Sequence, residues 1–161
     1  EQAHVGLDLL TLVSLNYKED IDMVDQNCAY CMEGELVAKF GIKICELETS
    51  KVYLFKEQSH PGRCIVAHKK HVGDMNELTA EERAAYFEDV ARVARAIMKA
   101  FNPDKVNYGA YGDTGHHLHF HLCPKYKDEY EWGGVFLMNP DKKYLTDAEY
   151  AEMIEKIKAN L

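Results

Sequence analysis

The segment His116-His117-Leu118-His119-Phe120-His121-Leu122-Cys123 decides the fold of this chain. Side chains of a β-strand alternate between its two faces, with a rise of about 3.3 Å per residue. As a strand, the segment places His117, His119 and His121 on one face, each about 6.6 Å from the next, and turns its apolar residues toward a core. A histidine-rich exposed strand or a metal-binding tract is the alternative interpretation. The strict alternation and the preceding turn at 112–115 favour a functional site.

Short runs rich in β-forming residues predict the other strands of the sheet. A hairpin is expected around Thr49-Ser50, and a Pro61-Gly62 turn precedes the next strand. The predicted strands are 42–47, 51–55, 64–67, 106–111 and 116–123.

Two helices are predicted from apolar stripes and from their start signals. Thr79 and Glu82 match a capping box at the start of a helix over 79–101, which Asn102-Pro103 ends. Thr146 and Glu149 start a second helix over 146–160. This order of elements predicts an α+β fold with a mainly antiparallel sheet. Residues 1–25 are interpreted as an N-terminal extension and 26–161 as one domain.

Composition restricts the classes of function. The 161 residues are 47% hydrophobic and carry 19 basic against 27 acidic side chains, for a net charge of −8. An acidic chain is a poor non-specific binder of nucleic acid, although a few local donors can still hold a small phosphorylated ligand. No apolar run approaches the roughly 20 residues of a membrane span. We therefore expect neither a membrane segment nor non-specific nucleic-acid binding.

Cys28-Ala29-Tyr30-Cys31 has the spacing of half a zinc site. The residues alone leave three interpretations open: a metal knuckle, a redox pair or a chance spacing. Five cysteines are an odd number in a chain large enough to fold without disulfides. A reducing, cytoplasmic compartment is therefore predicted.

His117-Leu118-His119-Phe120-His121-Leu122-Cys123 resembles the signature of the histidine triad (HIT) family, in which three histidines alternate with apolar residues. The resemblance runs from about Asn27 to Pro140 and includes Lys69-Lys70-His71. It implies a two-fold homodimer with a sheet continued across the interface. It also implies hydrolysis or transfer at the α-phosphorus of nucleotide phosphoramidates, phosphate esters or dinucleoside polyphosphates.

The resemblance also assigns roles within the motif. It implies that the middle histidine, His119, attacks phosphorus and forms a phosphohistidine-type intermediate. A neutral imidazole suits this role, because a pKa of about 6.5 leaves most of it unprotonated at pH 7. His121 is expected to support the phosphate or His119, and Thr114 to donate a hydrogen bond to the substrate.

Zinc-containing bacterial members imply the remaining ligands of the cysteine pair. In them the histidine after Lys-Lys and the first triad histidine complete the site, and these positions are His71 and His117. Two thiolates and two imidazoles fill a tetrahedral zinc without an open position, so the resemblance implies a structural zinc.

Three positions depart from the family pattern, and together with Trp132 they are predicted to bind substrate. Arg63 stands where a fourth histidine is often found, and its guanidinium can bind a phosphate oxygen; His60 is a possible substitute for that histidine. Glu57 is the candidate acid for ribose, with a one-residue shift in register. Asp113 replaces a glutamine, and Trp132 is placed at the border of the site.

Two other functions compete with the phosphorus-transfer enzyme. The first is a nucleotide-binding or protein-interaction module that keeps the fold and the zinc but turns over slowly. The second is a zinc-dependent hydrolase in which the histidines form an open metal site. A closed four-ligand site would leave no catalytic metal for the second.

Overall fold

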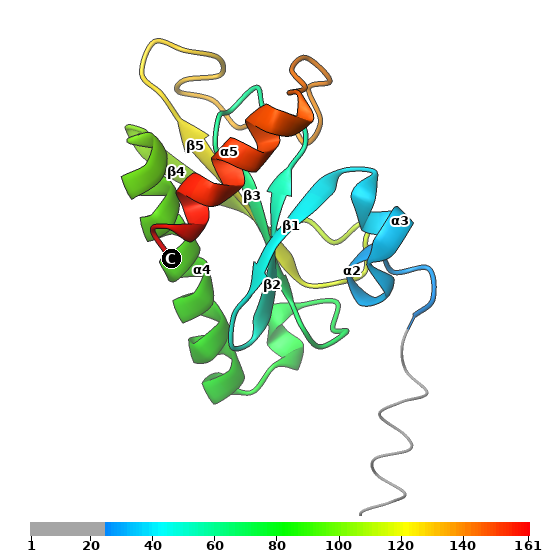
Figure 1. The fold of residues 1–161 in the computed structure, drawn as a ribbon. Helices are drawn as coiled ribbons and strands as arrows, with labels where there is room; N and C mark the ends of the chain where they lie inside the picture. Colours follow the sequence, from blue (N-terminus) through cyan, green and yellow to red (C-terminus); the bar gives the residue numbers. More distant parts are fainter. Residues whose placement is uncertain (1–24) are drawn as a thin grey trace, which may run out of the picture.

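A computed structural model describes residues 25–161 (Figure 1). All of the predicted N-terminal extension except Asp25 lies outside the described residues. The core of the fold is a five-stranded sheet in the order β1-β2-β3-β5-β4, and all four strand pairings are antiparallel. The strands are β1 (Gly41–Glu46), β2 (Ser50–Phe55), β3 (Cys64–His68), β4 (Lys105–Gly109) and β5 (His119–Lys125).

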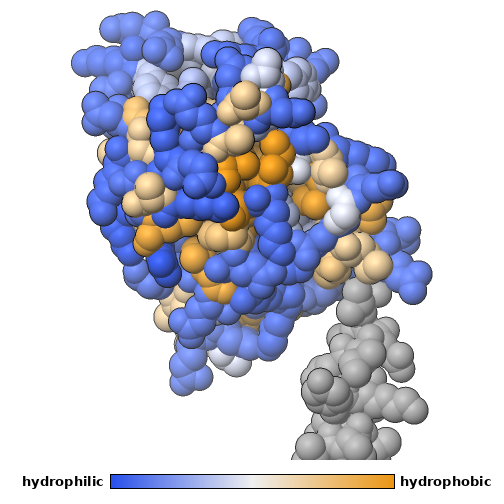
Figure 2. Space-filling model, viewed as in Figure 1, coloured by the Kyte–Doolittle hydropathy of each residue, from blue (hydrophilic) through white to orange (hydrophobic). Residues whose placement is uncertain are grey.

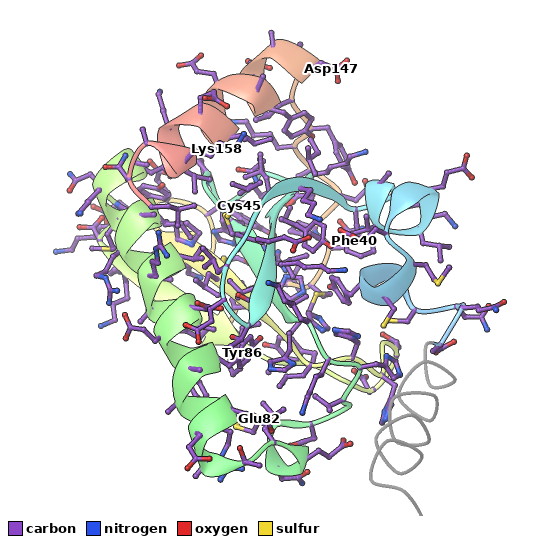
Figure 3. The ribbon with its side chains drawn as sticks, turned by 60° about the horizontal axis from the view of Figure 1, so that its bottom comes forward. Phe40, Cys45, Glu82, Tyr86, Asp147 and Lys158 are labelled. Carbon is purple, nitrogen blue, oxygen red and sulfur yellow. The ribbon has the colours of Figure 1, made fainter. Side chains whose placement is uncertain are left out.

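The two long helices begin where the capping boxes predicted. In α4 (Ala80–Phe101), Thr79 accepts from the backbone N–H of Glu82, whose carboxylate accepts from the N–H of Thr79. The same reciprocal pair starts α5 (Asp147–Lys158). Glu82 lies at the start of α4 and Tyr86 one turn further on (Figure 3). The Tyr86 hydroxyl donates to the carbonyl of Val66 at 2.7 Å and so ties the helix to β3.

The helices α4 and α5 cover one face of the sheet (Figure 1). Alternate residues of the central strands point to this side, as a period of two requires. They meet apolar side chains of both helices in the main core, which includes Val52, Leu54, Cys64, Val66, Val93, Ile97, Phe120, Leu122, Ile154 and Ile157.

The opposite face of the sheet carries a smaller core and the histidines. Two short helices that the sequence patterns did not reveal cover part of it, α2 (Ala29–Met32) and α3 (Gly34–Ala38). In β5, His119 and His121 pair with Ala67 and Ile65 of β3, both of which belong to this smaller core. Directly opposed residues of antiparallel strands share a face, so both imidazoles lie on the side of α2 and α3.

Two predicted strand boundaries were wrong. The strand expected at 116–123 begins at His119 and runs to Lys125, and the strand expected at 106–111 is Lys105–Gly109. Residues 116–118 precede the regular ladder: the N–H of His117 donates to Gly115 O and that of Leu118 to Val72 O, while Leu118 O still accepts from the N–H of His68. The alternation of the three histidines nevertheless survives, since Tyr30 packs against both His117 and His119.

The chain between β5 and α5 forms turns and irregular structure at 126–146, here called the 126–146 segment. A one-turn 3-10 helix, η1 (Met75–Glu77), precedes α4. Polar residues cover most of the face shown in Figure 2, and apolar residues show mainly in its middle. Within residues 25–161, no helix combines the length and the apolarity needed to cross a membrane.

Candidate active site and metal centre

Cys28, Cys31, His71 and His117 converge on one point. One donor atom from each lies within 4.8 Å of the other three. Cys28 Sγ is 3.3 Å and Cys31 Sγ 3.5 Å from His117 Nδ1, while His71 Nδ1 is 3.2 Å from Cys31 Sγ and 3.3 Å from His117 Nδ1. The structure thus brings together all four residues predicted as metal ligands.

The donor set fits a tetrahedral metal ion. Zn–S bonds of about 2.3 Å and Zn–N bonds of about 2.0 Å separate neighbouring ligand atoms by about 3.3–3.8 Å. The observed S–N and N–N separations of 3.2–3.5 Å match this spacing. All four positions are filled by protein atoms, so an ion held here has no open position for substrate.

Local structure explains how the four donors meet. Cys28 occupies the N-cap position of α2 without a capping bond from its side chain, and Cys31 follows one helical turn later on the same side. His117 donates from Nε2 to the carbonyl of His68 at 2.7 Å, which leaves the lone pair of Nδ1 facing the sulfur atoms. Burial lowers the pKa of His117 to about 4, so the ring is neutral, as a metal ligand must be.

His119 has one nitrogen committed to the backbone. Its Nδ1 lies 2.7 Å from His117 O, and a carbonyl can only accept, so Nδ1 carries the proton. Nε2 therefore keeps its lone pair. Burial lowers the pKa of His119 below its ordinary value, which favours this neutral form. The ring packs on Tyr30, with centroids 4.9 Å apart, and lines a cavity of about 160 Å³.

His121 contacts the residue that replaces the fourth histidine. Arg63 Nη2 lies 3.0 Å from His121 Nδ1, and the His119 and His121 ring centroids are 5.3 Å apart. Burial, followed by the charge of Arg63, lowers the pKa of His121 to about 2. His121 is therefore neutral throughout the physiological range.

Among residues 25–161, the other predicted site residues form no hydrogen bond with a triad histidine, although Gly112, two residues before Thr114, lines the same cavity as His119. Thr114, Asp113 and Trp132 are exposed. His60 is buried, and its Nε2 lies 2.6 Å from Glu131 Oε2 rather than at the triad. His60 therefore does not take the place of the fourth histidine. Arg63 occupies that place and contacts His121.

Glu57 has its carboxylate engaged within the protein. It accepts hydrogen bonds from the hydroxyl and N–H of Ser59 and from the N–H groups of Lys142 and Lys143. Glu57 is 2% exposed and joins β2 to the 126–146 segment. Ribose binding by Glu57 stays a prediction that nothing in this geometry supports.

Three aromatic residues that the sequence did not assign to the site pack on the triad histidines or on Arg63. Tyr30 packs on His117 and His119, Phe55 contacts His121, and Phe136 packs on Arg63. Tyr30 was singled out only as part of the cysteine pair, and Phe136 comes from a segment without periodicity. The alternation of β2, which turns Phe55 to the histidine face, was the one available clue.

Comparison with known proteins assigns the family. A model of the HIT domain matches residues 41–128, more than half of the chain, so the protein belongs to the HIT domain family. Adenosine 5'-monophosphoramidase hnt1 of Schizosaccharomyces pombe is 28% identical over 116 residues, covering 66% of this chain and 80% of that protein.

Solved structures confirm the fold. A histidine triad protein from Sinorhizobium meliloti superposes with a TM-score of 0.73 at 23% identity, covering 80% of this chain and 95% of its own. A Zn-bound histidine triad family protein from Mycobacterium smegmatis gives a TM-score of 0.59 at 21% identity, over 82% of this chain and 93% of its own.

The Glu57 clamp predicts a pH-dependent contribution to stability. Burial alone would raise the pKa of Glu57, but the hydrogen bonds from Ser59, Lys143 and Lys142 outweigh it and hold that pKa below its usual value. A carboxyl with a lowered folded-state pKa stabilises the fold fully above its usual pKa of about 4.3. This contribution is lost as the pH falls through the folded-state pKa.

We therefore expect Glu57→Gln to lower the free energy of unfolding at pH 7 by about 1–3 kcal/mol. The difference from the native protein should shrink below pH 4. Denaturant titrations between pH 3 and 8 measure it, with the exposed Glu48→Gln as the matched control. A Glu57→Gln effect no larger than the control, or one that grows toward low pH, would contradict the clamp.

Proposed function

We propose that the protein is a nucleotidyl hydrolase or transferase that acts at the α-phosphorus of nucleotide phosphoramidates, phosphate esters or dinucleoside polyphosphates, with His119 as the nucleophile. The observation that carries this proposal is the bond from His119 Nδ1 to His117 O, which leaves a lone pair on Nε2 of a neutral ring. The similarity to an adenosine monophosphoramidase supports the phosphoramidate class first.

The chemistry proceeds by two displacements. In the first, His119 Nε2 forms a bond to the α-phosphorus while the bond from phosphorus to the leaving atom breaks. A leaving amine takes up one proton from solvent, whereas a leaving phosphate departs as the anion. In the second, water attacks the same phosphorus, the P–N bond breaks, and the water releases one proton. Splitting one substitution into two in this way is nucleophilic catalysis. His121 supports the transferring group, and Thr114 remains a predicted substrate contact.

Replacing the nucleophile gives the direct test. His119→Ala should lose essentially all turnover of adenosine and guanosine phosphoramidates, because the covalent step needs its Nε2. Truncating a supporting hydrogen-bond donor should instead lower kcat by about 100- to 1,000-fold. The exposed His116→Ala provides a matched control and should retain near-native turnover.

Two results would decide against the enzyme. Turnover by His119→Ala at a near-native rate would remove the proposed nucleophile. Tight nucleotide binding by the native chain without turnover of any substrate in the panel would favour the low-turnover binding module instead.

We propose zinc as the ion of the Cys28-Cys31-His71-His117 centre, in a structural role. Two thiolates and two imidazoles are a common zinc ligand set, and a Zn-bound neighbour shares the fold. Zinc bound here would cross-link α2 to the segments that carry His71 and His117. The thiolates need a reducing environment, in keeping with the proposed cytoplasmic location.

Elemental analysis should find one zinc per chain in protein purified without chelator. Cys31→Ser should lose the ion and unfold at a lower temperature, because folding and metal binding are coupled. Cys45→Ser is the matched control, since Cys45 lies on β1 outside the cluster. Native protein without zinc, or equal zinc loss in the two variants, would rule out this centre.

We also propose a two-fold homodimer in which the sheet continues across the β4 edge. In the described sheet β4 pairs only with β5, and Tyr108 of β4 is 52% exposed. With Ala91, Ala94 and Met98 of α4, Tyr108 borders a shallow apolar hollow. An unpaired strand edge beside apolar residues favours pairing with a second copy.

Sedimentation at micromolar concentration should therefore report a dimer. Tyr108→Glu should weaken association at least about tenfold, equivalent to 1.4 kcal/mol, by burying a charge at the interface. Tyr144→Glu is the matched control, because Tyr144 lies outside β4 and is similarly exposed, at 55%. This variant should remain a dimer. A native monomer would contradict this proposal.

A further inference from the structure

Arg63 is a fully buried cation beside the triad. Its side chain has no exposed surface, and its guanidinium lies 4.3 Å from the centroid of the Phe55 ring and 4.9 Å from that of Phe136. Among residues 25–161 it forms no ion pair within 4 Å. Burying a charge without an opposite charge is costly, and contact with aromatic faces offsets only part of that cost.

The hydrogen bonds of Arg63 connect the 126–146 segment to His121. Nη1 donates to the carbonyl of Leu137 at 3.0 Å, and Nη2 donates to His121 Nδ1 at 3.0 Å. Nη2 also contacts Met138 Sδ at 3.6 Å. Both terminal nitrogens are therefore engaged inside the protein, whereas the buried Nε has no hydrogen-bond partner among the described residues. Arg63 is not among the residues that line the cavity at His119.

The Arg63 bond fixes the position of the proton on His121. A guanidinium has only donors, so His121 Nδ1 must accept and must be unprotonated. The single proton of the neutral ring then resides on Nε2, which becomes a donor. Protonating Nδ1 as well would break the bond and place two positive charges side by side.

His119 is held in the opposite state. Its Nδ1 donates to His117 O, so its Nε2 has a lone pair and no proton. The two neighbouring rings, with centroids 5.3 Å apart, therefore differ in chemistry although they are the same residue type. One presents a nucleophile and the other a hydrogen-bond donor, which are the two groups that attack on phosphorus requires.

We propose that Arg63 is a positioning residue that holds His121 as an Nε2–H donor to the phosphoryl oxygens during transfer at His119. Arg63 acts through His121 and does not touch the substrate. The inference rests on the proposed function for its consequence in catalysis, whereas the assignment of the proton on His121 concerns the resting protein alone. It replaces the expectation that Arg63 binds a phosphate oxygen directly.

Nitrogen-15 NMR of the histidine rings measures the assignment directly, because protonated and unprotonated ring nitrogens have well-separated shifts. In the native protein His121 should show a protonated Nε2 and an unprotonated Nδ1. Arg63→Met keeps an unbranched side chain between the two rings but removes the donors, and should leave His121 as a mixture of both tautomers. Arg63→Lys, which retains one donor and the charge, should restore the native assignment at least in part.

Kinetics separate positioning from direct binding. Arg63→Met should lower kcat and kcat/KM together by about two- to tenfold with little change in KM, because a mixture of tautomers leaves the Nε2–H donor on only part of the molecules. The kcat of Arg63→Lys should lie between those of Arg63→Met and the native protein. Arg92→Met is the matched control at an exposed arginine outside the apolar hollow beside Tyr108 and should behave as native.

Several results would overturn the proposal. One is a proton on His121 Nδ1 in the native protein. This measurement needs only the native sample, so it decides the assignment even if Arg63→Met fails to fold. Others are an unchanged His121 tautomer in folded Arg63→Met, or a raised KM at unchanged kcat, the mark of direct substrate binding. Absence of turnover in the native protein would overturn the proposed function and the positioning role that depends on it, while the NMR result still decides the tautomer.

Discussion

Each histidine of the triad has one ring nitrogen bonded to a group that can only accept or only donate. A backbone carbonyl accepts from His117 Nε2, another accepts from His119 Nδ1, and a guanidinium donates to His121 Nδ1. Since a neutral imidazole carries one proton, each bond determines the chemistry of the other nitrogen. The same side chain thereby supplies a metal ligand, a lone pair and a hydrogen-bond donor within five residues.

Buried charges hold the irregular part of the chain against this site. Glu57 accepts from the backbone at Lys142 and Lys143, and Arg63 donates to Leu137 O. Lys125 adds bonds to the carbonyls of Glu131 and Gly134. A segment without helix or strand has backbone groups that need partners, and charged side chains of the sheet region provide them. Packing of Phe136 on Arg63 couples this segment to His121.

Local patterns predicted the parts of the fold that depend on neighbours in sequence. The capping boxes at Thr79 and Thr146 located both long helices, and the alternation at 117–122 separated the histidine face from the core. The short helices α2 and α3 lacked such a pattern, because four or five residues cannot display a helical period. The start of β5 was misplaced because its last pair with β3 is His119 opposite Ala67, one residue before β3 ends at His68.

The site was predictable only where the resemblance supplied a motif. The four residues predicted as metal ligands do converge, although they span 90 positions of the chain, Cys28 to His117 inclusive. The partner of His121 was not predictable, because the bond to Arg63 joins residues 58 positions apart and is stabilised by Phe136 from a third segment. Contacts of this kind depend on packing that no periodicity encodes.

Identifying the nitrogen atom that becomes bonded to phosphorus tests the central claim most directly. A reaction with a phosphoramidate, quenched in alkaline denaturant to preserve P–N bonds, allows the adduct to be mapped by peptide mass and its attachment atom to be identified by phosphorus–nitrogen NMR. The hydrogen bond from His119 Nδ1 to His117 O predicts attachment at His119 Nε2. Attachment at His119 Nδ1, or at His121, would contradict it.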